Sequence, residues 1–195
     1  MKILALIFLI TFFTTITNAQ ITKGNWMVGG DASFSTSDTY SNIGDETKIV
    51  ERAVNISPNI GYFAIDKLAT GIRLDYRGVF NPNYGFGDIS TNSIGLGPFV
   101  RYYFLKPEKR VNIFLEMSYG FGKTFYNGSI ISADYVTKNT TFTIMGGPVI
   151  YFNSSVSMEL SVQYSSTRKI FEVQDLTNNV FQIGLGFQIY LEKNN

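Results

Sequence analysis

Seven charged residues could do chemistry in this sequence, because they share the polar side of segments whose other side is apolar. They are Asp31, Arg73, Asp75, Arg77, Arg101, Glu116 and Glu159. Carboxylates and guanidinium groups brought together in this way form networks of charge-assisted hydrogen bonds, or they line a path for ions. Four of them, Arg73, Arg101, Glu116 and Glu159, lie about four to six residues from one end of their segments, so we expect them to meet near one level.

Catalysis is not expected from these residues. The sequence contains no histidine and no cysteine, which removes the commonest general base and the thiol nucleophile. Glu116 and Glu159 are the one pair of inward carboxylates at similar depth, which is the minimum for acid–base chemistry. Inside a closed sheet, however, a polymeric substrate could not reach them. We therefore predict no catalytic residue and no enzyme activity.

Cofactor and metal motifs are also incomplete. Gly122 and Lys123 resemble the end of a phosphate-binding loop, but Met117 stands where the first glycine of that motif belongs. Without histidine or cysteine, only carboxylates such as Asp45 and Glu46 could hold a metal ion, and these are more typical of solvated loop charges. We predict neither a cofactor nor a metal.

The segments that carry the charged residues alternate apolar and polar side chains over about ten positions each. In the clearest one, Ile94, Leu96 and Val100 fall on one face, and Gly97 and Arg101 fall on the other. A strand points successive side chains to opposite faces, so this period of two predicts strands. The eight predicted strands cover residues 25–36, 49–65, 68–78, 93–104, 111–122, 138–152, 156–165 and 179–191.

The connections between these strands are alternately long and short. Long polar segments cover residues 36–48, 79–91, 123–137 and 166–178, and the short turns lie at residues 66–67, 106–110 and 153–155. This order, with two-sided strands, predicts an all-β fold: an eight-stranded antiparallel up-and-down transmembrane β-barrel, with lipid outside and polar groups inside. Because eight strands leave room only for their own side chains, we expect the inward charges to form a plug of ion pairs rather than a gate.

A weak repeat places Pro58, Pro98 and Pro148 each four residues before an aromatic residue near a short turn. Proline removes a donor from the strand ladder, so three equivalent prolines indicate bends in the wall. We expect the aromatic residues to form a girdle at the short-turn end.

The N-terminus has the form of a secretory signal peptide. Lys2 precedes an apolar run over residues 3–13, and a short polar stretch leads to Ala19. We predict cleavage after Ala19, leaving residues 20–195 as one domain. The apolar run is too short for a membrane helix. Removing Lys2 balances the basic and acidic residues, and without an excess of clustered Lys and Arg we predict no nucleic-acid partner.

Aromatic residues interrupt the otherwise polar long connections. Exposed aromatic side chains can anchor partners, but they can equally pack over the barrel mouth, which we consider the better expectation for any one of them. The candidates are Tyr40, Tyr84, Phe86, Tyr126 and Tyr135, with Ile130 and Ile131 beside them.

Several features belong together: the leader ending in Asn-Ala-Gln, the eight alternating strands, the Gly-Pro pairs at 97–98 and 147–148, and the final segment Gly-Leu-Gly-Phe-Gln-Ile-Tyr at 184–190. On these features the sequence resembles the small outer-membrane β-barrel proteins of Gram-negative bacteria, OmpA/OmpX-like in size and of the type found in Bacteroidetes. The resemblance implies location in the outer membrane, contact with its lipids, and a monomer. The sequence departs from such barrels at its end, where residues 192–195 follow the last aromatic residue.

Three functions fit this interpretation. The first is a structural or surface-interaction role, in which the external loops contact an extracellular or envelope protein. The second is a narrow, porin-like pore for ions or small solutes. The third is a soluble exported carrier of the lipocalin type, with the polar face outward. Residues 156–165 speak against the carrier, because their Ser-Glu-Ser-Gln-Ser face would line an apolar cavity poorly.

Overall fold

The computed structural model describes residues 21–41, 47–81, 89–128, 135–170 and 175–193. The predicted signal peptide, and Tyr84, Phe86, Ile130 and Ile131, lie outside the described residues. Among the described residues, no helix is long and apolar enough to cross a membrane.

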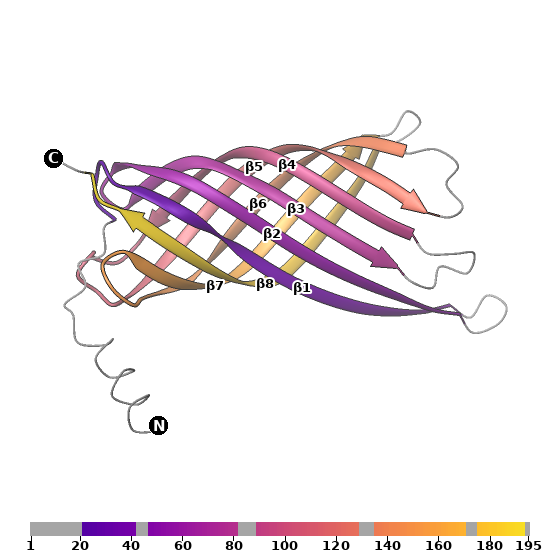
Figure 1. Ribbon diagram of the computed structural model, residues 1–195, viewed down its shortest axis with the longest axis horizontal. Coiled ribbons are helices and arrows are strands. Elements are labelled where there is room, and N and C mark those ends of the chain that lie inside the picture. The colour runs from indigo at the N-terminus through magenta and orange to yellow at the C-terminus, as the bar shows by residue number, and fades with distance from the viewer. Residues whose placement is uncertain (1–20, 42–46, 82–88, 129–134, 171–174, 194–195) are drawn as a thin grey trace, which may run out of the picture.

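The chain forms a closed barrel in which each strand is antiparallel to the next and β8 returns to β1 (Figure 1). The connections after β2, β4 and β6 lie at the end where both described chain ends lie, and those after β1, β3, β5 and β7, which the sequence predicts to be long, lie at the opposite end. The predicted eight-stranded up-and-down fold is therefore confirmed. The strands are β1 (Trp26–Ser41), β2 (Thr47–Ile65), β3 (Leu68–Asn81), β4 (Ile89–Tyr103), β5 (Val111–Gly128), β6 (Tyr135–Tyr151), β7 (Val156–Ile170) and β8 (Asp175–Leu191).

The two faces of the wall are those that the alternation predicted. On β7, the side chain of Leu160 is 51% exposed on the outside, whereas Ser161 is 3% exposed and faces the lumen. On β5, exposed Leu115 and Met117 alternate with buried Glu116. An apolar outer surface around a polar interior is the arrangement expected of a barrel in lipid.

The strands extend further toward the long connections than the alternation indicated. Tyr40, Tyr126 and Tyr135 were expected in loops, but they lie in β1, β5 and β6. The physical reason is that the strand ladder needs only backbone N–H and C=O groups, so pairing continues after the apolar alternation ends. The sequence pattern marks the height of the lipid-facing band, not the end of the strand.

The three repeated prolines interrupt the sheet at equivalent places. Pro58, Pro98 and Pro148 each fall in a gap of the ladder to the following strand. Proline has no N–H to donate, so a hydrogen bond is lost there. The register is the same on both sides of each gap, so these are interruptions without the extra residue of a bulge. Two prolines follow a glycine, Gly97 and Gly147, that packs closely against a facing backbone carbonyl.

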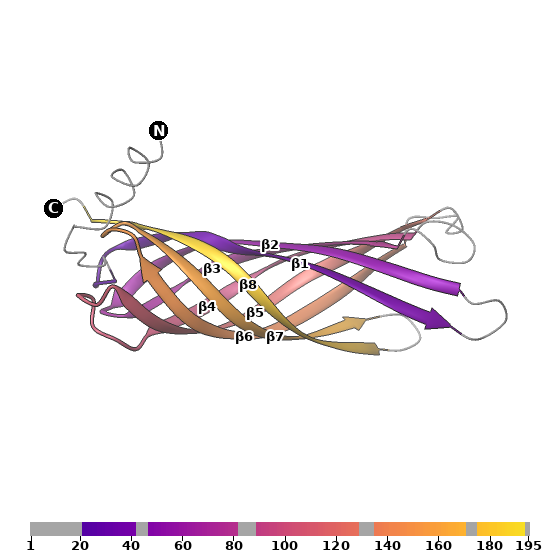
Figure 2. The ribbon, with the colours of Figure 1, turned by 90° about the horizontal axis from the view of Figure 1, so that it is seen from below.

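The β1–β8 seam is short. It pairs residues only from Trp26–Leu191 to Ala32–Leu185, while β1 stays paired with β2 as far as Ser41–Thr47. The outer part of β1 is therefore held by β2 alone. In both views the β1–β2 hairpin reaches beyond the other hairpins at the end of the long connections (Figures 1 and 2). The barrel thus carries one projecting arm at the end opposite the described chain ends.

Candidate functional site

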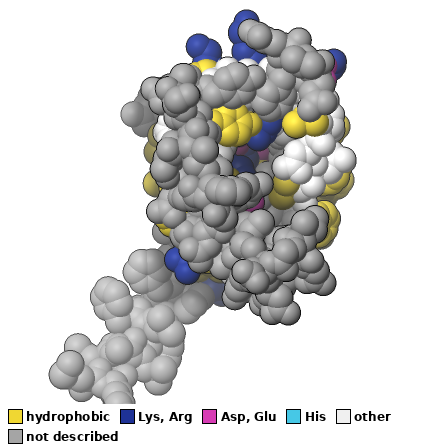
Figure 3. Space-filling model, turned by 90° about the vertical axis from the view of Figure 1, so that its right-hand side faces the viewer, with side chains coloured by type: hydrophobic (Ala, Val, Ile, Leu, Met, Phe, Trp, Pro, Cys, Tyr) yellow, Lys and Arg dark blue, Asp and Glu magenta, His cyan; other side chains and the backbone are white. Residues whose placement is uncertain are grey.

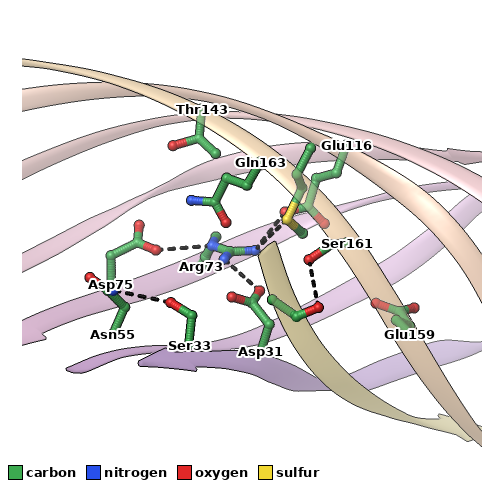
Figure 4. A network of polar contacts seen from close by, with 12 residues as sticks. Asp31, Ser33, Asn55, Arg73, Asp75, Glu116, Thr143, Glu159, Ser161 and Gln163 are labelled. Atoms are coloured by element: carbon green, nitrogen blue, oxygen red, sulfur yellow. Dashed lines mark hydrogen bonds and ion pairs between the residues drawn. The ribbon is translucent and has the colours of Figure 1, made fainter. Parts of the chain in front are cut away.

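Three of the inward carboxylates, Asp31, Asp75 and Glu116, meet at Arg73 (Figure 4). Its Nη2 donates to Asp31 Oδ1 over 2.6 Å, its Nε donates to Asp75 Oδ1 over 2.9 Å, and its Nη1 donates to Glu116 Oε1 over 2.9 Å. The Arg73 side chain is 1% exposed, so these bonds replace its water completely. One guanidinium from β3 thus binds carboxylates of β1, β3 and β5.

A second guanidinium continues the network toward the short turns. Arg101 Nε donates to Glu116 Oε2 over 2.6 Å, and Arg101 Nη1 lies 2.7 Å and 3.0 Å from the two oxygens of Glu159. The Arg101 guanidinium also lies 4.5 Å from the centre of the Phe114 ring, an arrangement that favours a cation. Arg101, Glu116 and Glu159 are all fully buried. These two arginines and the carboxylates Asp31, Asp75, Glu116 and Glu159 form one network of ion pairs, which we call the ion cluster.

Aromatic side chains close the lumen below this ion cluster. Arg101 Nη1 donates to the Tyr103 hydroxyl over 3.2 Å, and that hydroxyl lies 3.1 Å from the hydroxyl of Tyr190. The Tyr190 hydroxyl also lies 3.1 Å from Ser157 Oγ. Phe63 packs against both tyrosine rings, with centroids 6.0 Å and 6.2 Å away. We call this layer, which also holds Phe114 and Tyr151, the aromatic floor.

By the same alternation that turns Arg101 and Gln188 inward, Tyr103 and Tyr190 fall on the inner face, but the sequence alone gives them no role. Their position in the sequence could have identified them. An inward aromatic side chain close to a short turn is expected to fill the end of the barrel. Phe63 and Tyr151 occupy equivalent inward positions. Ion cluster and aromatic floor together seal the lower half of the lumen.

The carboxylates of the ion cluster have their oxygen atoms occupied by arginine. Both oxygens of Glu116 are bound, one by each arginine, and both oxygens of Glu159 face Arg101 Nη1. A general base needs a lone pair directed at its substrate, and these carboxylates direct theirs at guanidinium groups. The arrangement stabilises a filled wall and tolerates buried charge because each charge is paired.

Above the ion cluster the lumen widens into a polar recess, which we call the vestibule. Figure 3 looks onto this end of the barrel, and charged side chains are visible inside the ring of the wall. The cavity has a volume of about 140 Å³, and its lining includes Asp75, Arg77, Thr143, Gln163, Lys169 and Gln182. Hydroxyl, amide and charged groups line it, so it suits water and small polar solutes.

Arg77 belongs to the vestibule and not to the ion cluster. Its side chain is 31% exposed, its Nη1 donates to Asn55 Oδ1 over 3.3 Å, and its Nη2 lies 3.8 Å from Glu51. Asp75 lies at the boundary, because it binds Arg73 while its side chain is 41% exposed. Six of the seven predicted interior charges therefore share one network, and Arg77 lies above it.

Tyr126 is the one predicted contact residue whose side chain the structure describes. Lys169 Nζ donates to its hydroxyl over 3.1 Å and lies 5.4 Å from the ring centre. Tyr126 therefore packs against the neighbouring vestibule residue Lys169, which fits the packing alternative and not an exposed anchor. For Tyr40 and Tyr135 the structure gives only the backbone position in β1 and β6.

Comparison with known proteins gives one family and several structures. The family model described as outer membrane protein beta-barrel domain matches residues 4–188. The outer membrane protein OprG from Pseudomonas aeruginosa is similar with a TM-score of 0.50 and 12% identity, over 91% of this chain and 100% of that one. Neisserial surface protein A is similar with a TM-score of 0.47 and 16% identity, over 87% of this chain and 97% of that one. Ail of Yersinia pestis is similar with a TM-score of 0.46 and 14% identity, over 87% of this chain and 100% of that one. A comparison with curated proteins finds no match.

Proposed function

Because the chain belongs to the outer membrane protein β-barrel domain family, we propose that it is a non-enzymatic barrel of the Gram-negative outer membrane that works through surface interactions at its outward end. In this proposal the wall is a rigid anchor and the four hairpins at the long-connection end meet an extracellular or envelope protein. Longer connections on such barrels face the outside medium.

The observation that carries the proposal is the sealed lumen. Arg101, Glu116 and Glu159 fill one level of the barrel, and the aromatic floor fills the next. An ion crossing this region would have to displace paired, fully buried charges, which costs several kcal/mol for each charge left without its partner. What remains accessible to other molecules is the outward rim with its vestibule and hairpins.

The hairpins are suited to contact because they stand clear of the membrane on a rigid scaffold. The outer part of β1 is paired with β2 alone, so its other edge offers unpaired backbone groups. Loops positioned by a rigid scaffold are where binding residues concentrate. The β1–β2 arm is therefore the first part of the rim to test.

The two alternatives fit less well. A narrow pore would need a path through the ion cluster and the aromatic floor, whose side chains are buried. A soluble carrier of the lipocalin type would need its polar face outward, whereas exposed apolar residues such as Leu96, Leu160 and Ile183 cover the outside.

The test combines conductance with trimming of the arm. In planar bilayers the purified protein should give no unitary current. On intact cells, replacing residues 39–49 by an Asn-Gly turn should reduce adhesion to immobilised matrix proteins or to other cells. The matched control trims the β7–β8 hairpin by replacing residues 169–176 in the same way. Heat-modifiable migration in gels would verify that both variants keep the barrel. A steady unitary current in the wild type, or unchanged adhesion in both trimmed variants, would contradict the proposal.

A further inference from the structure

Two lysines lie side by side on the outer wall of the barrel. Lys123 on β5 and Lys138 on β6 are direct partners in the strand register, and both side chains are exposed on the lipid-facing side. Like charges directly opposite each other destabilise a sheet. In the described part of the chain neither ammonium group has a carboxylate within ion-pair distance. By contrast, Arg168, an outward cation of β7, is already paired with Asp175.

An apolar groove on the outer wall lies directly beside these two lysines. Leu74, Leu96 and Phe121 line it on the side of the membrane, and Ile94 and Ile170 flank the lysines in the same row of the sheet. The groove has a volume of about 590 Å³ and lies on the outer face of the wall. Its lining is almost wholly apolar, so it suits a hydrocarbon chain.

The lysines lie at the height where lipid headgroups begin. The outward residues of β5 are apolar or aromatic from Val111 to Phe121, and Lys123 is the first charged one after them. With a rise near 3.3 Å per residue and the usual tilt, this stretch spans about 25 Å, the height of the hydrocarbon band around such barrels. Lysine side chains at this boundary reach up to the polar layer while their stems stay in contact with the apolar surface.

We propose that this place binds one phosphorylated lipid of the outer leaflet, with its phosphate between Lys123 and Lys138 and an acyl chain in the groove. A phosphate between the two ammonium groups turns their repulsion into two attractive interactions. The apolar groove beside the lysines favours a lipid over a free anion, because only a lipid has a hydrocarbon chain to place in it. The site lies on the membrane-facing wall of β3 to β7, apart from the vestibule and the hairpin rim, so it is independent of the proposed surface-interaction role.

The test is a binding titration of the full-length protein in detergent micelles, followed by native mass spectrometry. The probes are lipid A, dephosphorylated lipid A and inorganic phosphate. Removing both charges with Lys123→Gln and Lys138→Gln should weaken lipid A binding about 25-fold, since each lysine near an anionic surface contributes roughly fivefold. The matched control, Lys106→Gln with Lys109→Gln in a short turn, removes the same charge at the other end and should leave binding unchanged.

A second variant separates the groove from the charges. Leu96→Trp fills the groove and keeps both lysines, so it should weaken lipid A binding while inorganic phosphate stays weak in every variant. Equal binding of lipid A and its dephosphorylated form would overturn the phosphate contact. Equal binding of inorganic phosphate would overturn the lipid and leave an adventitious anion. An equal loss in the Lys106/Lys109 control would show general attraction to the barrel and would also overturn the site.

Discussion

Arg101 and Glu116 are direct partners in the β4–β5 register, and Arg101 Nε donates to Glu116 Oε2 over 2.6 Å with both side chains fully buried. The other oxygen of Glu116 accepts a hydrogen bond from Arg73 over 2.9 Å. One carboxylate therefore joins guanidinium groups from β3 and β4 to its own strand β5. Such a bridge is sensitive to the loss of either arginine, because the remaining charge stays buried.

Arg101→Met should destabilise the barrel strongly. The substitution leaves Glu159 and one oxygen of Glu116 without their buried partner, which typically costs about 3–5 kcal/mol. Urea unfolding in detergent, followed by the fluorescence of Trp26, the only tryptophan, would measure the change. Arg77→Met is the matched control: that side chain is partly exposed and its ion pair is long at 3.8 Å, so a loss of about 1 kcal/mol or less is expected. Equal losses in the two variants would contradict the assigned role of the ion cluster.

Much of this cluster could be predicted from the sequence, and the limit is register. The period-two alternation assigned Arg73, Arg101 and Glu116 to the lumen, because apolar side chains facing lipid alternate with polar side chains facing the interior. Which carboxylate binds which arginine depends on how far each strand is shifted against the next. That shift is set by turn and loop geometry. The alternation also listed Arg77 among the inward charges; it lies further along β3 than Arg73, and the structure places it in the vestibule.

The same limit hid the lysine pair. Lys123 fell in the predicted long connection at residues 123–137, and Lys138 began the predicted strand at residues 138–152, so the alternation did not pair them. Pairing continues there because backbone hydrogen bonds do not require apolar side chains. Only the register of β5 with β6 shows that these two residues face each other.

Gly97→Ala should destabilise the barrel, whereas Gly95→Ala on the same strand should not. A Cβ on Gly97 would lie 2.0 Å from the backbone oxygen of Tyr119, so β4 and β5 would have to separate. At Gly95 the nearest atom would be 3.6 Å away, which is an ordinary contact. We expect a loss of about 1–3 kcal/mol for Gly97→Ala and a gain of up to about 1 kcal/mol for Gly95→Ala. Paired urea unfolding curves would measure both; equal stability would show that the proline gap leaves β4 free to adjust.

Asn59→Leu should stabilise the barrel, in contrast to Asn112→Leu. Both residues are buried, but neither amide atom of Asn59 has a partner in the described residues. Asn112 Oδ1 accepts from the backbone N–H of Leu105 over 2.9 Å, and its Nδ2 donates to the carbonyl of Leu105 over 3.3 Å. We expect a gain of about 1 kcal/mol at Asn59 and a loss of about 1–3 kcal/mol at Asn112. Thermal unfolding in one detergent would compare them; the reverse order would show that Asn59 is satisfied in the folded protein.

Cysteine labelling along β7 would test the facing of the wall on which the remaining assignments rest. The chain has no cysteine, so Leu160→Cys, Ser161→Cys, Val162→Cys and Gln163→Cys each create a single reporter. Residues 160 and 162 are exposed on the lipid side, and residues 161 and 163 are buried in the lumen. Each thiol is modified with a nitroxide in the unfolded protein, which is then refolded into liposomes; dissolved oxygen, which concentrates in hydrocarbon, should broaden the spectra of labels at 160 and 162 but not at 161 and 163.

That result would fix the direction of every strand, because antiparallel pairing couples the facing of β7 to β6 and β8 and so around the closed barrel. Val156→Cys at the short-turn end and Ile170→Cys at the outer end extend the series along the same face. A water-soluble maleimide added outside should label position 170 and spare position 156. Oxygen broadening at 161 instead of 160 would contradict this facing, because it would turn the ion cluster toward the acyl chains, where charges are costly to place.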